Sequence, residues 1–338
     1  MKISFLQMRR ALNVALFVLL LSVVGTKNTF AQTQLATLQH GDDLSVFYGP
    51  NAFVNAHNAA QGGDVITLSG GSFMPCTITK GITLRGAGCE IDTVANITPT
   101  IFSSGITLNV ADGPNALNVE GILFNCTVSF QKLYNPIFTK CYMDKWDYYY
   151  SYPSNYGYSS HAQFIDCFIK SFNNNYCTST IFINSVVSSF SSNSSYHCTA
   201  YNSIIKPSSG SLYALSAYNC IIQQASGTPS NCSFINCIGI GGNPFGGSNT
   251  IDCASYGSYG DVFETFTGNF NYGVSFVLKD EIATGFLGTD GTQVGVYGGF
   301  MPYDIRPSYM VVRRCNVSNR TTADGKLNVD IEVITEGD

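Results

Sequence analysis

Ile165-Asp166-Cys167-Phe168-Ile169 is one copy of a short pattern that recurs between residues 124 and 254. Each copy ends an apolar run with Asn, Asp or Lys, continues with Cys or Ser, and usually returns to an apolar residue. The steps between successive Cys or Ser positions are 15, 26, 18, 18, 17, 17 and 16 residues, for Cys126, Cys141, Cys167, Ser185, Ser203, Cys220, Cys237 and Cys253. A nearly constant period with a recurring local pattern predicts a stacked-repeat architecture.

The residue before each Cys or Ser is predicted to form a corner. A coil of this length holds only short strands joined by tight turns, and Asn and Asp tolerate the left-handed backbone that such turns need. Stacked about 4.8 Å apart, their side chains could also bond to one another as a ladder. The corner residues are Asn125, Asp166, Asn184, Asn202, Asn219, Asn236 and Asp252, with Lys140 breaking the pattern. Calcium coordination is the alternative role for the two aspartates, and no other metal or cofactor is expected.

The cysteines are interpreted as packing residues. The chain has 12 of them, and six occupy the repeated position, where Ser185 and Ser203 stand in two further copies. Serine seldom replaces a disulfide partner without loss, whereas it can replace a small, buried, stacking residue. We therefore expect the repeated cysteines to be mostly unpaired. No Cys-x-x-Cys pair or Cys/His cluster has zinc spacing, so structural zinc is not expected.

The N-terminus predicts export. Residues 1–31 combine a basic start, an apolar core and Thr29-Phe30-Ala31 before Gln32, which is the pattern of a cleavable signal peptide. An uncleaved N-terminal anchor is the alternative. No later run is long enough to span a bilayer. The protein is therefore expected to be secreted, periplasmic or at the cell surface.

Composition and charge narrow the class of partner. Of 338 residues only 12% are charged, against roughly 25% in average globular proteins, which suits an all-β chain with many turns. Without the predicted signal peptide, 13 basic and 22 acidic residues remain and no basic run is left. Nucleic acid and anionic membrane surfaces are therefore poor partner candidates.

Residues 45–88 carry the most specific pattern for the fold. Residues 52–60 predict a short amphipathic helix, followed by Gly62-Gly63-Asp64, a strand, and later Arg85-Gly86-Ala87-Gly88. This order resembles the start of a right-handed parallel β-helix of the pectate-lyase-like superfamily. The run 290–299 is similar to the end of exported β-helix proteins of Bacteroides-like bacteria. A left-handed β-helix is the alternative solenoid, but its six-residue repeats are not found.

The resemblance implies an all-β, single-stranded solenoid with an N-terminal capping helix and a C-terminal β-hairpin. We expect the parallel β-helix at 32–306, with its last coils near 261–306. A hairpin cap or small β module is expected at 307–338, where two alternating runs flank Asp324-Gly325. The oligomeric state is not predicted.

An aromatic insertion near residues 144–160 accounts for the 26-residue step. A loop that leaves a solenoid lies on its outer surface, where flat rings can stack on sugars or pack against a partner. The expected ligand-binding residues are Trp146, Tyr148, Tyr149, Tyr150, Tyr152, Tyr156 and Tyr158. Alternatively, the tyrosines fold back and cover a neighbouring coil.

Catalysis is the second hypothesis. The resemblance implies that an enzyme on this fold would be a polysaccharide lyase or a glycoside hydrolase. A lyase needs a base and often calcium, and a hydrolase needs carboxylates on one face. Between residues 101 and 260 the chain has five lysines and no arginine, which suits an anionic polymer poorly. The catalytic candidates are Asp144, Lys145, Asp147 and His161.

The expected function is therefore that of an exported, non-catalytic β-helix protein. It would bind a polysaccharide or cell-surface glycan, or act as an adhesin-like module. A carbohydrate-active enzyme that uses the 144–161 region is the alternative.

Overall fold

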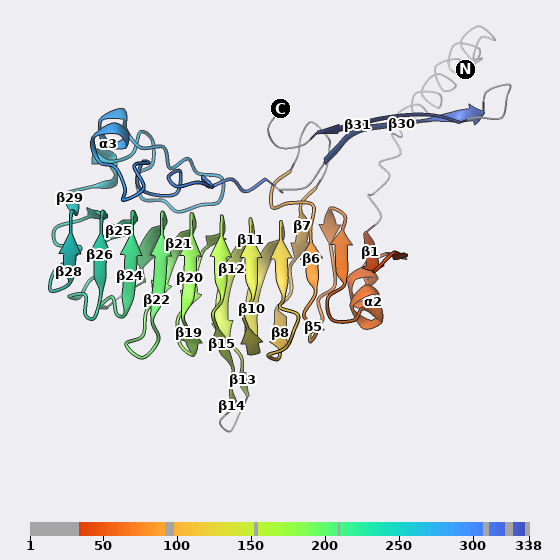
Figure 1. Cartoon of the computed structure of the whole chain (residues 1–338), viewed down its shortest axis with the longest axis horizontal. Coiled ribbons are helices and arrows are strands. Elements are labelled where there is room, and N and C mark those ends of the chain that lie inside the picture. Colours follow the sequence, from red (N-terminus) through yellow and green to blue (C-terminus); the bar gives the residue numbers. More distant parts are fainter. Residues whose placement is uncertain are drawn as a thin grey trace, which may run out of the picture. The chain divides into compact units, whose positions relative to one another are not determined.

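The chain folds as a parallel β-solenoid of about ten coils with very little helix (Figure 1). This confirms the predicted fold class. The computed structural model describes residues 34–91, 98–151, 155–208, 210–306, 311–321 and 327–334. The predicted signal peptide lies outside these residues.

Each coil contributes one strand to a sheet that we call sheet 1, which has 12 strands within the described residues. From β3 onward all neighbours pair in parallel, so equivalent residues of successive coils lie side by side. In spatial order its strands are β2 (Asp43–Tyr48), β1 (Leu35–His40), β3 (Val65–Leu68), β6 (Thr83–Arg85), β9 (Asn118–Glu120), β11 (Ile137–Thr139), β16 (Gln163–Ile165), β20 (Thr180–Ile183), β22 (Cys198–Tyr201), β24 (Leu215–Tyr218), β26 (Ser233–Ile235) and β28 (Asn249–Ile251).

The rest of each coil lies in sheet 2, which has 15 strands in the part of the chain described. Its longest strand, β10, pairs with β7 and β8 of the preceding coil and with β12 and β15 of the next. The strands are β4 (Gly71–Ser72), β5 (Thr77–Ile78), β7 (Thr100–Phe102), β8 (Ile106–Val110), β10 (Leu123–Tyr134), β12 (Tyr142–Tyr148), β15 (Tyr158–Ser160), β17 (Phe168–Ile169), β18 (Phe172–Asn173), β19 (Cys177–Thr178), β21 (Val186–Ser191), β23 (Ile204–Pro207), β25 (Ile221–Gln223), β27 (Ile238–Ile240) and β29 (Ala254–Tyr256).

Columns of apolar side chains fill the space between the sheets. Phe164 of sheet 1 packs its ring 5.0 Å from Trp146 and 5.6 Å from Phe172 of sheet 2. Because every coil adds one residue to each column, the core is continuous and each coil depends on its neighbours. The inward column of sheet 1 consists of Ile66, Leu84, Val119, Phe138, Phe164, Phe182, Ala200, Ala217 and Phe234, all buried.

The repeated Cys and Ser side chains stack at the corner between the two sheets. The backbone N–H of Cys167 donates to Ser185 Oγ at 3.1 Å, and that hydroxyl donates to the carbonyl oxygen of Phe164 at 3.0 Å. The Cys167 thiol makes the equivalent contact with the carbonyl oxygen of Phe138 at 3.3 Å. The position therefore requires a small side chain with a hydrogen-bond donor, which both residue types supply. The eleven cysteines whose side chains are described are all free.

The residues before them adopt the left-handed conformation, with φ between 45° and 55°, at Lys140, Asp166, Asn184, Asn202, Asn219, Asn236 and Asp252. Asn125 and Cys126 do not belong to this series. The pairing of Glu120 with Thr139 and of Leu123 with Tyr142 makes Gly121 (φ 64°) the corner of that coil. Asn125 and Cys126 instead lie within β10 at a shift of register, so their assignment to the corner series is wrong.

The first coil is covered by antiparallel strands and a helix. β1 pairs antiparallel with both β2 and β3. Helix α2 (Ala52–Ala59) buries Ala52, Phe53 and Ala56, and the Phe53 ring lies 5.1 Å from Phe102 of the core. α2 matches the capping helix expected from the sequence.

The coils end at β29, and residues 257–306 form a tail over the outer face of sheet 2 rather than the expected last coils. The tail holds the 3-10 helix η1 (Tyr259–Asp261) and helix α3 (Asp280–Gly285). Its apolar side chains, among them Phe263 and Phe276, pack on the outward residues Phe168, Val186, Ile204, Ile221 and Ile238. The tail thus buries a second apolar cluster outside the coils.

Two short antiparallel sheets complete the described chain. β13 (Tyr150–Ser151) pairs with β14 (Asn155–Tyr156) in the insertion. β30 (Val311–Thr321) pairs with β31 (Leu327–Ile334), which confirms the C-terminal hairpin. The residues of the expected Asp-Gly turn lie outside the described range.

Candidate ligand-binding cleft

Trp146 belongs to the core and not to an exposed loop. It lies in β12, is 0% exposed, and packs 5.1 Å from Phe130 and 5.4 Å from Phe138. The residues that leave the coil begin only after β12, at Tyr149. The expectation that Trp146 contacts a ligand is therefore wrong. Residues 142–148 form strand β12 of sheet 2 and not an external loop, and the indole points into the core.

Part of the predicted tyrosine surface is exposed. Tyr149, Tyr150 and Tyr158 are 37%, 51% and 37% exposed. Tyr158 packs edge-on against Tyr134, whereas Tyr148 is partly buried against the core and lies 4.9 Å from Tyr176. Tyr152 and the Tyr156 side chain lie outside the described residues. Three partly exposed rings, those of Tyr149, Tyr150 and Tyr158, thus lie near β13 and β14.

Three of the four catalytic candidates lie on β12, and all three are engaged in ion pairs. Asp144 accepts hydrogen bonds from Tyr142 Oη at 2.9 Å and from Lys170 Nζ at 3.1 Å. Lys145 Nζ lies 2.6 Å from Asp147 Oδ2. The Asp144 carboxylate and burial together raise the pKa of the Tyr142 hydroxyl, with burial the larger cause.

His161 is remote from these three residues. Lys145 pairs with Thr127 of β10, whereas Ser160 pairs with Tyr134 of the same strand. Seven residues of extended chain separate those two positions, roughly 20 Å at about 3.3 Å per residue. His161 contacts the neighbouring Ser160 hydroxyl instead. The structure therefore does not assemble the four candidates into one site.

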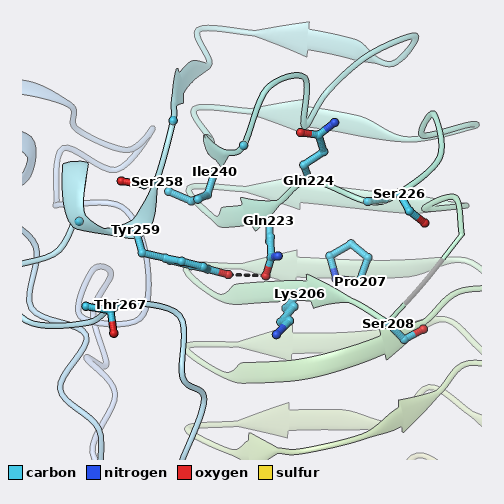
Figure 2. A pocket seen from close by; sticks show the side chains of 14 residues that line it. Lys206, Pro207, Ser208, Gln223, Gln224, Ser226, Ile240, Ser258, Tyr259 and Thr267 are labelled. Carbon is cyan, nitrogen blue, oxygen red and sulfur yellow. Dashed lines mark hydrogen bonds between the residues drawn. The ribbon is translucent and has the colours of Figure 1, made fainter.

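A cleft of about 930 Å³ lies where the tail meets the outer face of sheet 2 (Figure 2). One wall comes from β23, β25 and the residues that follow them, and the other from residues 257–260 and Thr267 of the tail. Its polar side chains are Lys206, Ser208, Gln223, Gln224, Ser226, Ser258, Tyr259 and Thr267, and no carboxylate is among the residues that line it. A volume of this size is typical of small-ligand sites.

Tyr259 reaches across the cleft from η1. Figure 2 shows its hydroxyl directed at the side chain of Gln223, and the hydroxyl donates a hydrogen bond to Gln223 Oε1. Burial raises the pKa of the Tyr259 hydroxyl, so the group stays neutral and keeps its proton. The ring is anchored on the tail by edge-on contacts with Phe266 and Phe270, at 4.9 and 5.9 Å.

Gln224 and Lys206 supply free donors. Gln224 Oε1 accepts from the backbone N–H of Gly242 at 2.6 Å, which leaves the Nε2 group without a partner among the described residues. Lys206 Nζ lies 5.2 Å from the centre of the Phe270 ring and pairs with no described carboxylate. The cleft therefore offers both donors and acceptors, an aromatic wall and one positive charge.

These residues were missed because they come from three coils and from the tail. Lys206, Gln223 and Tyr259 are far apart in the sequence, and no spacing rule brings them together. A partial signal is the pair Gln223-Gln224 directly after Ile221-Ile222, where polar side chains follow a strand with both faces apolar.

The described residues were not found to offer a metal site or a membrane-spanning helix. No group of three or more His, Cys, Asp or Glu side chains within the described residues could hold a metal ion. None of the described helices has the length and apolar character needed to cross a membrane. Comparisons of the chain with protein-family models, with curated proteins and with solved structures each find no match.

Proposed function

We propose that the protein is an exported β-solenoid of the pectate-lyase-like kind, from a Bacteroides-like bacterium, that binds glycans without cleaving them. The cleft beside Tyr259 is its binding site. The observation that supports this proposal is the lining, because hydroxyl and amide groups can both donate to and accept from sugar hydroxyls. An aromatic wall such as the Tyr259 ring suits the apolar face of a sugar.

The lining also favours binding over hydrolysis. Glycoside hydrolases need two carboxyl groups about 5 to 10 Å apart on either side of the scissile bond. The carboxylates of Asp144 and Asp147 are on β12, are held by lysines, and do not line the cleft. An oligosaccharide that is bound and not cleaved is therefore the proposed ligand class, at the cell surface or outside the cell.

Glycan-array binding followed by calorimetry tests the proposal. We expect Tyr259→Ala to lower the affinity for a bound oligosaccharide at least tenfold, because it removes the wall and the bond to Gln223. Tyr259→Phe should have a smaller effect, since it keeps the ring. Tyr150→Ala is the matched control, a 51% exposed tyrosine outside the cleft, and should leave affinity within twofold.

The opposite ranking of the Tyr259→Ala and Tyr150→Ala variants would move the site to the insertion. An array on which no glycan binds would overturn the proposal.

A further inference from the structure

In the part of the chain that the structure describes, sheet 1 ends in an edge strand on each side. β2 is its first strand and β28 its last. In β28 the Asn249 N–H donates to the carbonyl of Cys232, and the Ile251 carbonyl accepts from Asn236 N–H. Since neighbouring residues of a strand point their backbone groups in opposite directions, the N–H and C=O of Thr250 face away from the sheet. Such unpaired edges are templates for pairing with another chain.

Both edges also expose apolar side chains. On β2, Leu44, Val46 and Tyr48 are 65%, 41% and 66% exposed, and on β28 Ile251 is 48% exposed. The space between the sheets is closed at both ends, by Phe53 of α2 and by Phe245, which packs 5.0 Å from Phe234. The core is thus closed, and among the described residues nothing pairs with the outer edges of β2 and β28.

Strand direction makes the two edges compatible. β1 is antiparallel to β2 and to β3, so β2 runs parallel to β3 and therefore to every later strand of sheet 1, β28 included. A second copy, displaced along the stack without rotation, would place its β2 beside β28 in the direction that the sheet already uses.

The outward side chains match as well. The register of sheet 1 links Val46 at one end to Ile251 at the other through a single column of Thr37, Thr67, Arg85, Glu120, Thr139, Ile165, Ile183, Tyr201, Tyr218 and Ile235. In a stacked pair the column would continue from Ile235 and Ile251 of one copy to Val46 of the next. An apolar side chain would thereby meet an apolar side chain.

We propose that the protein associates head to tail, with the β28 edge of one copy pairing with the β2 edge of the next. The contact is heterologous, so it propagates into short linear assemblies rather than closing as a dimer. A coil of about 17 residues at about 3.3 Å per residue has a perimeter of roughly 55 Å, which limits each end face to a few hundred Å². Interfaces of that size are weak and transient, so we expect the association to be reversible.

Light scattering coupled to size-exclusion chromatography tests this on the purified protein. Wild-type mass should grow with concentration. Val46→Lys blocks one end and Ile251→Lys the other, so each variant alone should stay monomeric. An equimolar mixture should form a dimer and nothing larger, because each chain retains one intact end. Both residues are exposed, and lysine on an edge strand is tolerated in folded proteins.

Leu287→Lys is the matched control, since Leu287 is 44% exposed but lies in the tail and not at a sheet edge. It should associate like the wild type, and circular dichroism should show the same fold for all variants. If Ile251→Lys remains dimeric while Val46→Lys does not, two β2 edges pair with each other and the proposal is overturned. A wild-type protein that is monomeric at every concentration up to about 100 µM overturns it too.

Discussion

The outer faces of the two sheets differ although the same coils build both. In sheet 2 the outward residues Phe168, Val186 and Ile204 are at most 2% exposed, because the tail covers them. In sheet 1 the outward column is half-buried to exposed, with Tyr201 40% exposed. The sequence carries this difference as apolar doublets after the corner, such as Ile204-Ile205 and Ile221-Ile222. A doublet of this kind indicates a strand buried on both faces.

The largest expected effect comes from truncating equivalent isoleucines on the two faces. Ile221→Ala should cost about 2 to 5 kcal/mol in the free energy of unfolding, because Ile221 is 1% exposed beneath the tail. Ile183→Ala, on the open face of sheet 1, should cost about 1 kcal/mol or less. Urea unfolding followed by circular dichroism measures both. Equal losses would mean that the tail contributes little to stability.

Replacing a corner residue that the tail covers should lower the free energy of unfolding more than replacing a corner residue that the tail does not reach. Asn219 Oδ1 accepts from the backbone N–H of Thr289 at 2.9 Å and from its hydroxyl at 3.2 Å, whereas Asp252 is exposed and bonds no tail residue. Asn219→Ala should cost about 2 to 3 kcal/mol, through the lost bonds and a left-handed alanine. Asp252→Ala, at a similar φ, should cost only about 1 to 2 kcal/mol.

Glycine separates those two contributions, because it adopts the left-handed conformation without strain. Asn219→Gly should cost about 1 kcal/mol for the lost bonds, and Asp252→Gly should be close to neutral. Thermal unfolding of the four variants checks this ranking. Equal stability of Asn219→Gly and the wild type would show that the bonds to the tail carry no net energy.

The smallest effect concerns the end of the tail and depends on pH. Burial acts to raise the pKa of the Asp304 carboxyl, but hydrogen bonds and charge from Arg306 outweigh it and hold the pKa below its ordinary value. The stabilisation is therefore complete above about pH 4, where the unfolded carboxyl is ionised, and is lost as pH falls through the lower folded pKa.

Asp304→Asn should accordingly lower the midpoint of thermal unfolding slightly at pH 6, and this effect should shrink as the pH is lowered below about 4. Arg306 is 74% exposed and Asp304 30% exposed, so solvent screens the pair and the loss at pH 6 should be below about 1 kcal/mol. A difference between the variant and the wild type that does not shrink on acidification would assign the effect to something other than this carboxylate.

The corners were predictable because their cause is local. Asn and Asp before a small side chain favour the left-handed turn wherever they stand, and the period then repeats it. The same local reasoning failed at Phe124-Asn125-Cys126. These residues match the Asn-Cys corner pattern but lie inside the long strand β10. Only the pairing of Glu120 with Thr139 reveals that Gly121 holds that corner.

The neighbouring residues in the sequence do not reveal that the Trp146 side chain lies in the core and not on the surface. Asp144, Lys145 and Asp147 surround it with charge, which imitates a surface loop. Asp144 pairs with Lys170, and Asp147 pairs with Lys145 and accepts a hydrogen bond from Asn173, while the indole enters the core. The shift of register in β10 beside β12 further obscures the alternation that a strand would normally display.

The solenoid, its corners and the interchange of Cys and Ser can be inferred from the residue pattern alone, because they depend on backbone preference and a repeated spacing. The place where the tail returns, and hence which face is covered and where the cleft lies, follows from the folded chain. That placement depends on contacts between segments far apart in the chain, such as Tyr259 with Gln223, and such contacts leave no local trace in the sequence.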